Sequence, residues 1–183
     1  MKRLNKAGFT LIELLAVITI MGILMMVAIP SVSRTIENSR RDTFADNALT
    51  YVNTVRNAVM ADELSCKYDA SGNTVTASAT PNGTYYFVIN TSEQQTKDLM
   101  EKVALSSWGS AEITGYVKWV KDTNTTTNRT TTEYYVKLRD TGSHGFKDEV
   151  AEKDVSRAKI FTEGAVAISA PTSPGTPYPC TLK

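Results

Sequence analysis

Hydrophobic positions divide the chain into an unbroken apolar stretch, an amphipathic stretch and a long polar remainder. Between Phe9 and Ile29 the only clearly polar residues are Thr10, Glu13 and Thr19. A helix of that length is roughly 30 Å long, which matches the hydrocarbon core of a bilayer. The first stretch therefore predicts a helix that can lie in a membrane.

The pattern becomes amphipathic beyond Pro30. Apolar residues then recur every three or four positions, which is typical of one buried helix face: they are Phe44, Ala48, Val52, Val55 and Val59, with Val32 and Ile36 extending the face less regularly. We expect one long helix from Phe9 to about Glu63, whose second half packs on a folded domain. A kink is expected at Pro30, because proline removes a backbone donor and clashes with the preceding turn.

Charged residues fill the other faces of this second half. Among them, Arg40, Arg41 and Asp42 follow one another in the sequence, and Arg56 lies further along. We interpret the Arg40–Asp42 run as a solvated surface.

Period-two alternation in the remainder of the chain predicts strands at Tyr85–Ile89, Gly115–Lys121 and Glu133–Arg139. The Thr- and Asn-rich segment Asp122–Thr132 should form the exposed tip of a hairpin between the last two. A long helix packed on an antiparallel sheet follows, which is an α+β fold.

Weaker patterns predict several further elements. Ser92-x-x-Gln95 resembles a capping box and predicts a short helix over Glu93–Ser106. The remaining expectations are a short strand near Thr74–Ser78, an ambiguous loop or helical turn at Lys147–Arg157, a last strand or hairpin at Lys159–Phe161 and Ala165–Ser169, and an irregular tail at Ala170–Lys183, which contains four prolines.

Composition argues against several function classes. The formal net charge of +1 over 183 residues gives no strong field for nucleic acid. There are two cysteines and one histidine, His144, which cannot readily supply a standard zinc site. His144 lies in a predicted turn and is interpreted as a surface residue. With no glycine-rich phosphate loop and no catalytic cluster, we expect no enzyme and no cofactor.

Acidic residues gather late in the chain, at Asp140, Asp148, Glu149, Glu152 and Asp154. Their spacing does not match an EF-hand loop. We interpret them as a solvated acidic surface and expect no metal site.

The start of the chain carries the most specific motif. Lys2, Arg3 and Lys6 precede the sequence Gly8-Phe9-Thr10-Leu11-Ile12-Glu13, and the apolar run follows. A carboxylate at the centre of a membrane helix costs about 2.5–3.5 kcal/mol on insertion scales, so Glu13 suggests a charged partner. A secretory signal has a shorter apolar core with a small-residue cleavage site after it, whereas here the small residues come before.

This motif closely resembles the processing site of type IV prepilins and pseudopilins over about residues 5–30. The resemblance implies cleavage between Gly8 and Phe9 by a prepilin peptidase, N-methylation of Phe9, and an assembly role for Glu13. Gly22 and Pro30 match positions where helices of the family loosen on entering a filament. Beyond this segment the resemblance is one of architecture.

Cleavage at Gly8 would place an ammonium one helical turn from Glu13. The pair could form within one chain, since residues four apart share a helix face, or between chains. The resemblance implies the second arrangement, and the residues alone leave both open. A plain signal anchor with an incidental glutamate is the alternative interpretation of the motif.

Cys66 and Cys180 could join the end of the long helix to the tail. Export favours oxidation, so we expect this disulfide. Many Gram-negative pilins instead close a short loop near the C-terminus, and the chain departs from that pattern.

Taken with the resemblance, these patterns predict four segments: a basic leader at 1–8, a transmembrane and filament-core helix at 9–30, an amphipathic half-helix at 31–64, and an extracellular headgroup at 65–183. The expected function is a structural subunit of a type IV pilus, serving adhesion, motility or DNA uptake. Its expected partners are copies of itself, other pilins, the prepilin peptidase and the pilus assembly platform.

Before assembly the subunit would be a single-pass membrane protein with a cytoplasmic N-terminus, and afterwards part of a surface filament. One alternative is a pseudopilin of a type II secretion or competence system. Another, of a different class, is a monomeric membrane-anchored binding domain.

Overall fold

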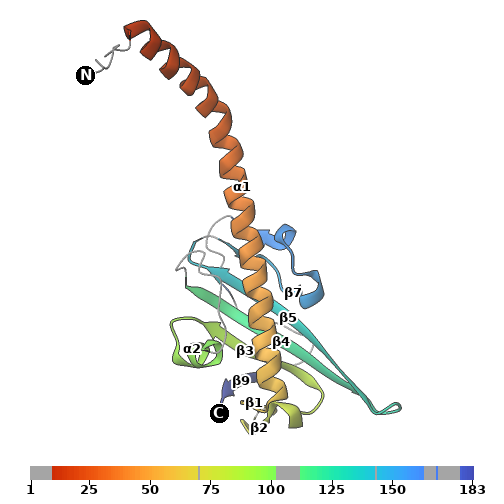
Figure 1. Cartoon of the computed structure of the whole chain (residues 1–183). Coiled ribbons are helices and arrows are strands. Elements are labelled where there is room, and N and C mark those ends of the chain that lie inside the picture. Colours follow the sequence, from red (N-terminus) through yellow and green to blue (C-terminus); the bar gives the residue numbers. More distant parts are fainter. Residues whose placement is uncertain (1–9, 70, 102–111, 143, 163–167, 169–177) are drawn as a thin grey trace, which may run out of the picture. The chain divides into compact units, whose positions relative to one another are not determined.

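The computed structural model describes residues 10–69, 71–101, 112–142, 144–162, 168 and 178–183. A long N-terminal helix precedes a mixed, mostly antiparallel sheet, so the fold is α+β, as expected (Figure 1). The chain divides into two compact units, Met1–Ser39 and Arg40–Lys183. We call the second the sheet unit, and each unit is described by itself.

Two helices and nine strands lie in the described residues, together with short 3-10 turns at Ala77–Ala79, Glu152–Asp154 and Arg157–Lys159. The helices are α1 (Leu11–Met60) and α2 (Gln94–Met100). The strands are β1 (Leu64–Lys67), β2 (Thr74–Thr76), β3 (Gly83–Asn90), β4 (Ile113–Asn124), β5 (Arg129–Asp140), β6 (Gly145–Phe146), β7 (Val150–Ala151), β8 (Ile160–Phe161) and β9 (Tyr178–Leu182).

The strands form one sheet in the order β2-β1-β9-β3-β4-β5-β6-β8, and β7 pairs with β5 beside this path. All neighbours run antiparallel except β3 and β9, which are parallel. The predicted antiparallel sheet is confirmed except at this one pair, where the C-terminal strand enters the sheet beside β3.

The core lies between one face of the sheet and the part of α1 that belongs to the sheet unit. Alternate residues of β3, β4 and β5 form rows on this face, for example Phe87 opposite Val117 and Val117 opposite Val136. All three are buried, as are Val52 and Val55 of α1. The predicted amphipathic face of the helix is thus the face that packs: Phe44, Ala48, Val52 and Val55 are buried and Val59 is partly buried. Val32 and Ile36 are exposed.

Gly115 interrupts one of these rows for a steric reason. Its φ of +146° is a conformation that side chains rarely adopt, and a Cβ there would lie 2.1 Å from the backbone oxygen of Lys137. The close approach of β4 to β5 at this point therefore requires glycine.

Helix α1 runs through Pro30 without ending and stops at Met60, three residues before the predicted end at Glu63. The Glu63 amide donates to the Ala58 carbonyl and the Asp62 amide to the Val59 carbonyl, the two bonds of a Schellman motif. Asp62 occupies the left-handed position, with φ 57°. Because this position is occupied by a residue other than glycine, the sequence contains no clear stop signal for the helix.

Three local predictions needed correction. The strands of the β4–β5 hairpin extend to Asn124 and Arg129, so most of the predicted tip is paired strand. The strand expected at Thr74–Ser78 ends at Thr76 and passes into a 3-10 turn. Helix α2 begins at Gln94 with Glu93 at its N-cap and no side-chain cap bond, so the capping box at Ser92 does not form.

The Ser92 amide instead donates to the Asn90 side chain at 3.1 Å, which forms a turn before the helix. The residues beyond Glu101 in the predicted helix lie outside the described part, as does nearly all of the segment expected at Ala165–Ser169.

The C-terminal tail contains a strand where an irregular end was expected. β9 pairs with β1 on one side and with β3 on the other, so it is an inner strand of the sheet. Its ladder with β1 ends at the Cys66–Cys180 pair, next to Pro179. Pro179 thus lies just beyond the end of the β1 ladder, whereas on the other side of β9 it lies opposite Tyr86 in the middle of the β3 ladder.

Two charged residues of α1 contact residues between Arg157 and Thr162, much later in the sequence. Arg41 donates to the Thr162 hydroxyl at 3.0 Å, and Arg157 contacts the Asp42 carboxylate at 3.2 Å. Arg41 is partly buried, which departs from the interpretation of Arg40–Asp42 as a solvated surface, whereas Arg40 and Asp42 are exposed. A solvated charge and a charge paired across the fold have the same local sequence pattern.

Candidate functional site

The apolar first part of α1 is the candidate site. Every residue from Thr10 to Ile36 is exposed, including large apolar side chains throughout. Among the described residues, α1 is the one helix with the length and composition to cross a membrane. So much exposed apolar surface on one helix needs lipid or other helices around it.

Glu13 lies at the start of this helix and caps it. The Thr10 amide donates to Oε2 of Glu13 at 2.8 Å, and the Thr10 hydroxyl donates to the same oxygen at 2.7 Å. The Glu13 amide donates in return to the Thr10 hydroxyl at 3.3 Å. This reciprocal pattern is a capping box, which satisfies donors that a helix start leaves unpaired.

The capping box gives Glu13 a local role that the sequence reasoning missed. The signal was present, since Thr10-x-x-Glu13 is the threonine form of the capping pattern. The box uses the backbone amide of Thr10, which stays an amide if the chain is cut before Phe9. A processed chain could therefore keep this bond or exchange it for an ammonium partner.

Of the other predicted site residues in this segment, Gly22 and Pro30 lie within the described part of the chain. Gly8 and Phe9 lie outside the described residues. Gly22 lies within α1, and a Cβ built there meets no atom within 4 Å. Pro30 also lies inside the helix.

Comparison with protein families decides what this segment is. Residues 3–29 match the prokaryotic N-terminal methylation motif. The chain carries the type IV prepilin signature. The match covers Gly8, Phe9, Glu13 and Gly22, and it leaves the sheet unit outside. Comparison with curated proteins and with solved structures gave no match.

This signature supports a pilin-like or pseudopilin protein of a structural kind. It suggests assembly with other pilins and processing by the prepilin peptidase. Together with the apolar helix, it fits a membrane-anchored precursor.

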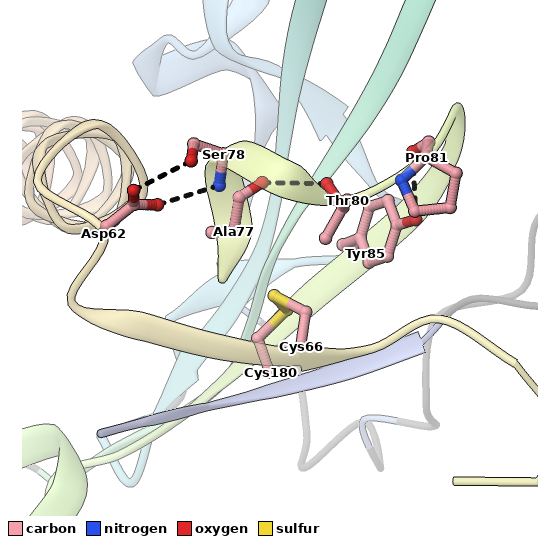
Figure 2. The surroundings of a disulfide bond; sticks show 8 residues. All are labelled: Asp62, Cys66, Ala77, Ser78, Thr80, Pro81, Tyr85 and Cys180. Carbon is pink, nitrogen blue, oxygen red and sulfur yellow. Dashed lines mark hydrogen bonds between the residues drawn. A yellow bond between two sulfur atoms is a disulfide. The ribbon is translucent and has the colours of Figure 1, made fainter. Parts of the chain in front are cut away.

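In the sheet unit, a disulfide joins Cys66 and Cys180 (Figure 2). The two residues lie opposite each other in the β1–β9 ladder and both are buried. The bond therefore ties the C-terminal strand to the strand that follows α1.

Polar contacts beside the disulfide support the turn at the end of α1. The Asp62 carboxylate accepts hydrogen bonds from the Ser78 amide at 3.0 Å and the Ser78 hydroxyl at 2.8 Å (Figure 2). These bonds hold the pKa of the Asp62 carboxyl below its ordinary value, the side-chain bond contributing most. Further along, the Tyr85 hydroxyl donates to the Pro81 carbonyl at 3.0 Å.

Three of the late acidic residues, Asp140, Glu149 and Glu152, bind separate partners. Glu152 forms an ion pair with Arg56 of α1, and Glu149 forms one with Lys118 of β4. Asp140 contacts the His144 ring at 3.3 Å. The His144 side chain is mostly buried, so its interpretation as a surface residue was wrong. No group of His, Cys, Asp and Glu within the described residues is arranged to hold a metal ion.

Proposed function

We propose that this chain is a structural pilin subunit of a type IV pilus, which polymerises through its N-terminal helix into a surface filament. The observation that carries the proposal is the methylation motif at residues 3–29, which covers the apolar first part of α1, where every described residue is exposed. The fold adds support, since a helix whose second half packs on a sheet can present its first half to neighbours.

The proposal assigns each segment a role. Residues 1–8 are a basic leader removed by prepilin peptidase, with cleavage between Gly8 and Phe9 and N-methylation of Phe9. Residues 9–30 hold the subunit in the membrane, N-terminus inward, and later form the filament core. Residues 31–64 attach that helix to the headgroup at 65–183, which faces the outside.

Burial of apolar helix surface is the driving force for polymerisation. Each fully buried leucine, isoleucine or methionine contributes about 1.5–3 kcal/mol relative to exposure in water. In lipid this gain is smaller, because acyl chains already solvate the helix. Glu13 sets the axial register, since its carboxylate pairs with the terminal ammonium of a neighbouring subunit.

Processing has a direct test by mass spectrometry of the protein isolated from membranes. We expect a mature chain that begins with N-methylated Phe9. A Gly8→Leu variant should keep its leader, because the peptidase would no longer accept the site. Mature protein that retains Met1 would contradict the assignment of the leader.

Polymerisation has a separate test by immunogold electron microscopy with antibody against the sheet unit. We expect label along surface filaments. Label confined to the membrane would favour a monomeric anchored domain, and filaments that appear only on overproduction would favour a pseudopilin.

A further inference from the structure

The β4–β5 hairpin has one edge that is closed and one that is open. On the β4 side, the Asn82 side chain donates to the Thr123 carbonyl at 3.2 Å and accepts from the Thr123 amide at 3.0 Å. These two bonds continue the β3–β4 ladder, whose last backbone pair is Gly83 with Lys121. The amide thus occupies backbone groups that a foreign strand would use.

On the β5 side, the described residues provide no such cover. β7 pairs with β5 only at Tyr135 and Val136, and β6 only at Arg139. The segment Arg129–Glu133 therefore pairs with β4 alone, and all five of its residues are exposed. Natural proteins usually protect such edges, because an unpaired strand is a template for another chain.

The sequence of this edge is self-complementary in charge. It reads Arg129-Thr130-Thr131-Thr132-Glu133. If a second copy pairs antiparallel about Thr131, Arg129 of each copy lies opposite Glu133 of the other, and threonines lie opposite threonines. Opposite charges and Thr–Thr pairs are favourable cross-strand neighbours, whereas like charges directly opposite are unfavourable.

We propose that the Arg129–Glu133 edge binds the same edge of a second copy of this chain, as an antiparallel two-fold contact that joins two sheets. Such a contact is isologous, so it closes on two copies and does not propagate. In a filament of parallel subunits it would join headgroups of neighbouring filaments. It goes beyond the proposed function, since it needs a second copy but no filament.

Disulfide crosslinking of the full-length protein in membranes tests the register. A Thr131→Cys variant should form a covalent dimer on mild oxidation, because the two-fold axis places both copies of residue 131 face to face. The matched control is Thr126→Cys, which lies in the exposed turn of the same hairpin but outside the paired segment. Equal crosslinking of the two variants would overturn the proposal.

Charge reversal then tests the complementarity. In the Thr131→Cys background, Arg129→Glu alone and Glu133→Arg alone should each lower the dimer yield by about fivefold or more, since each replaces two ion pairs by two like-charge pairs. The double variant Arg129→Glu/Glu133→Arg should restore the yield.

Mixing gives the sharpest form of the experiment. In the Thr131→Cys background, differently tagged Arg129→Glu and Glu133→Arg variants should crosslink to each other at a much higher yield than either crosslinks to itself. Failure of this pair to combine would overturn the proposal, even if filaments form. Combination in cells without filaments would support it while contradicting the pilus assignment.

Discussion

Tyr51 shows how a single residue of α1 is held in the core. It is fully buried, and its hydroxyl has no hydrogen-bond partner among the described residues. Burial raises the pKa of Tyr51 to about 12, because the phenolate would lose its hydration. The ring contributes packing, whereas the hydroxyl costs stability.

We predict that Tyr51→Phe leaves stability unchanged or raises it by about 1 kcal/mol, since it removes an unsatisfied buried group and keeps the ring. Urea unfolding of the full chain in detergent measures this. The matched control Tyr51→Ala should lose about 3–5 kcal/mol. A clear loss of stability in the phenylalanine variant would show that the hydroxyl has a partner.

Lys118 is a buried cation on the sheet face opposite the α1 core. It forms an ion pair with Glu149, and its Nζ lies 4.6 Å from the centre of the Tyr135 ring. The Tyr116 hydroxyl also donates to Glu149 at 3.1 Å. The pKa of Tyr116 is raised, mainly because the side chain is buried and secondly because the negative Glu149 carboxylate lies beside it.

Removing Glu149 alone should therefore destabilise the fold more than replacing both Lys118 and Glu149 by apolar residues. We predict that Glu149→Gln costs about 3 kcal/mol, because it leaves Lys118 buried without a counter-charge. The double variant Lys118→Met/Glu149→Leu should recover much of this loss. Unfolding curves of the two variants compare them, and equal losses would contradict a buried pair.

Asp62 gives the α1 terminus a dependence on pH. Its pKa is lowered in the folded state, so it stabilises the fold fully above the ordinary carboxyl pKa of about 4. The contribution is lost as the pH falls through the lower folded value. We predict that an Asp62→Asn variant is less stable than the unchanged protein at pH 7 and that the difference shrinks towards pH 3.

Thermal unfolding at several pH values measures this difference. Ser78→Ala serves as the control, because it removes the side-chain donor and should reproduce most of the effect. A difference that does not change with pH would assign the role of Asp62 to backbone conformation alone.

At the scale of elements, β9 is the strand on which the sheet unit depends. It joins the β1–β2 hairpin to β3, and the disulfide fixes it to β1. In the chain-entropy account, a bridge across a sequence separation of 114 stabilises by at most about 5 kcal/mol.

We predict that reduction, or the double variant Cys66→Ala/Cys180→Ala, destabilises the sheet unit by a few kcal/mol. Hydrogen exchange should increase first in β9 and β1. The control is β5, which pairs with neither β1 nor β9 in the sheet. Unchanged exchange in β9 after reduction would show that its ladders alone hold the strand.

The elements that the sequence predicted well are the long regular ones. The four-residue and three-residue spacing in α1 and the alternation in β3, β4 and β5 are direct consequences of burying one face. The two-residue strands β6, β7 and β8 are too short to show a period. β9 escaped prediction because the prolines of the tail suggested irregular chain, and its place in the sheet depends on distant residues.

In the candidate site too, local features could be predicted from the sequence and long-range contacts could not. The Gly8–Glu13 motif is local, so it was recognised from sequence alone. The Thr10-x-x-Glu13 capping pattern is equally local and could have been recognised from the sequence. The pairing of Arg56 with Glu152, by contrast, joins residues far apart in the chain. Charges such as these reveal their partners only in the fold.

At the scale of the whole molecule, the chain combines an apolar helix without cover in the first unit with a compact second unit whose core includes the rest of that helix. In the pilin subunit that we propose, this helix can leave the membrane only if other helices replace the lipid. Glu13 is the one charged residue between Phe9 and Ile29, and we propose that it links neighbouring subunits.

Two substitutions separate that link from the local cap. Glu13→Val removes both the charge and the capping oxygen. Glu13→Gln removes the charge but keeps an acceptor for the Thr10 amide, since glutamine also completes a capping box. Both variants should still be inserted and processed, because Gly8 and Phe9 are unchanged.

The most direct measurement is the number of surface filaments labelled by antibody against the sheet unit, in cells that produce the unchanged chain, the Glu13→Gln variant or the Glu13→Val variant at equal membrane levels. We expect labelled filaments with the unchanged chain and almost none with either variant. Filaments from Glu13→Gln as abundant as those from the unchanged chain would contradict a charge link between subunits and leave Glu13 with its capping role alone.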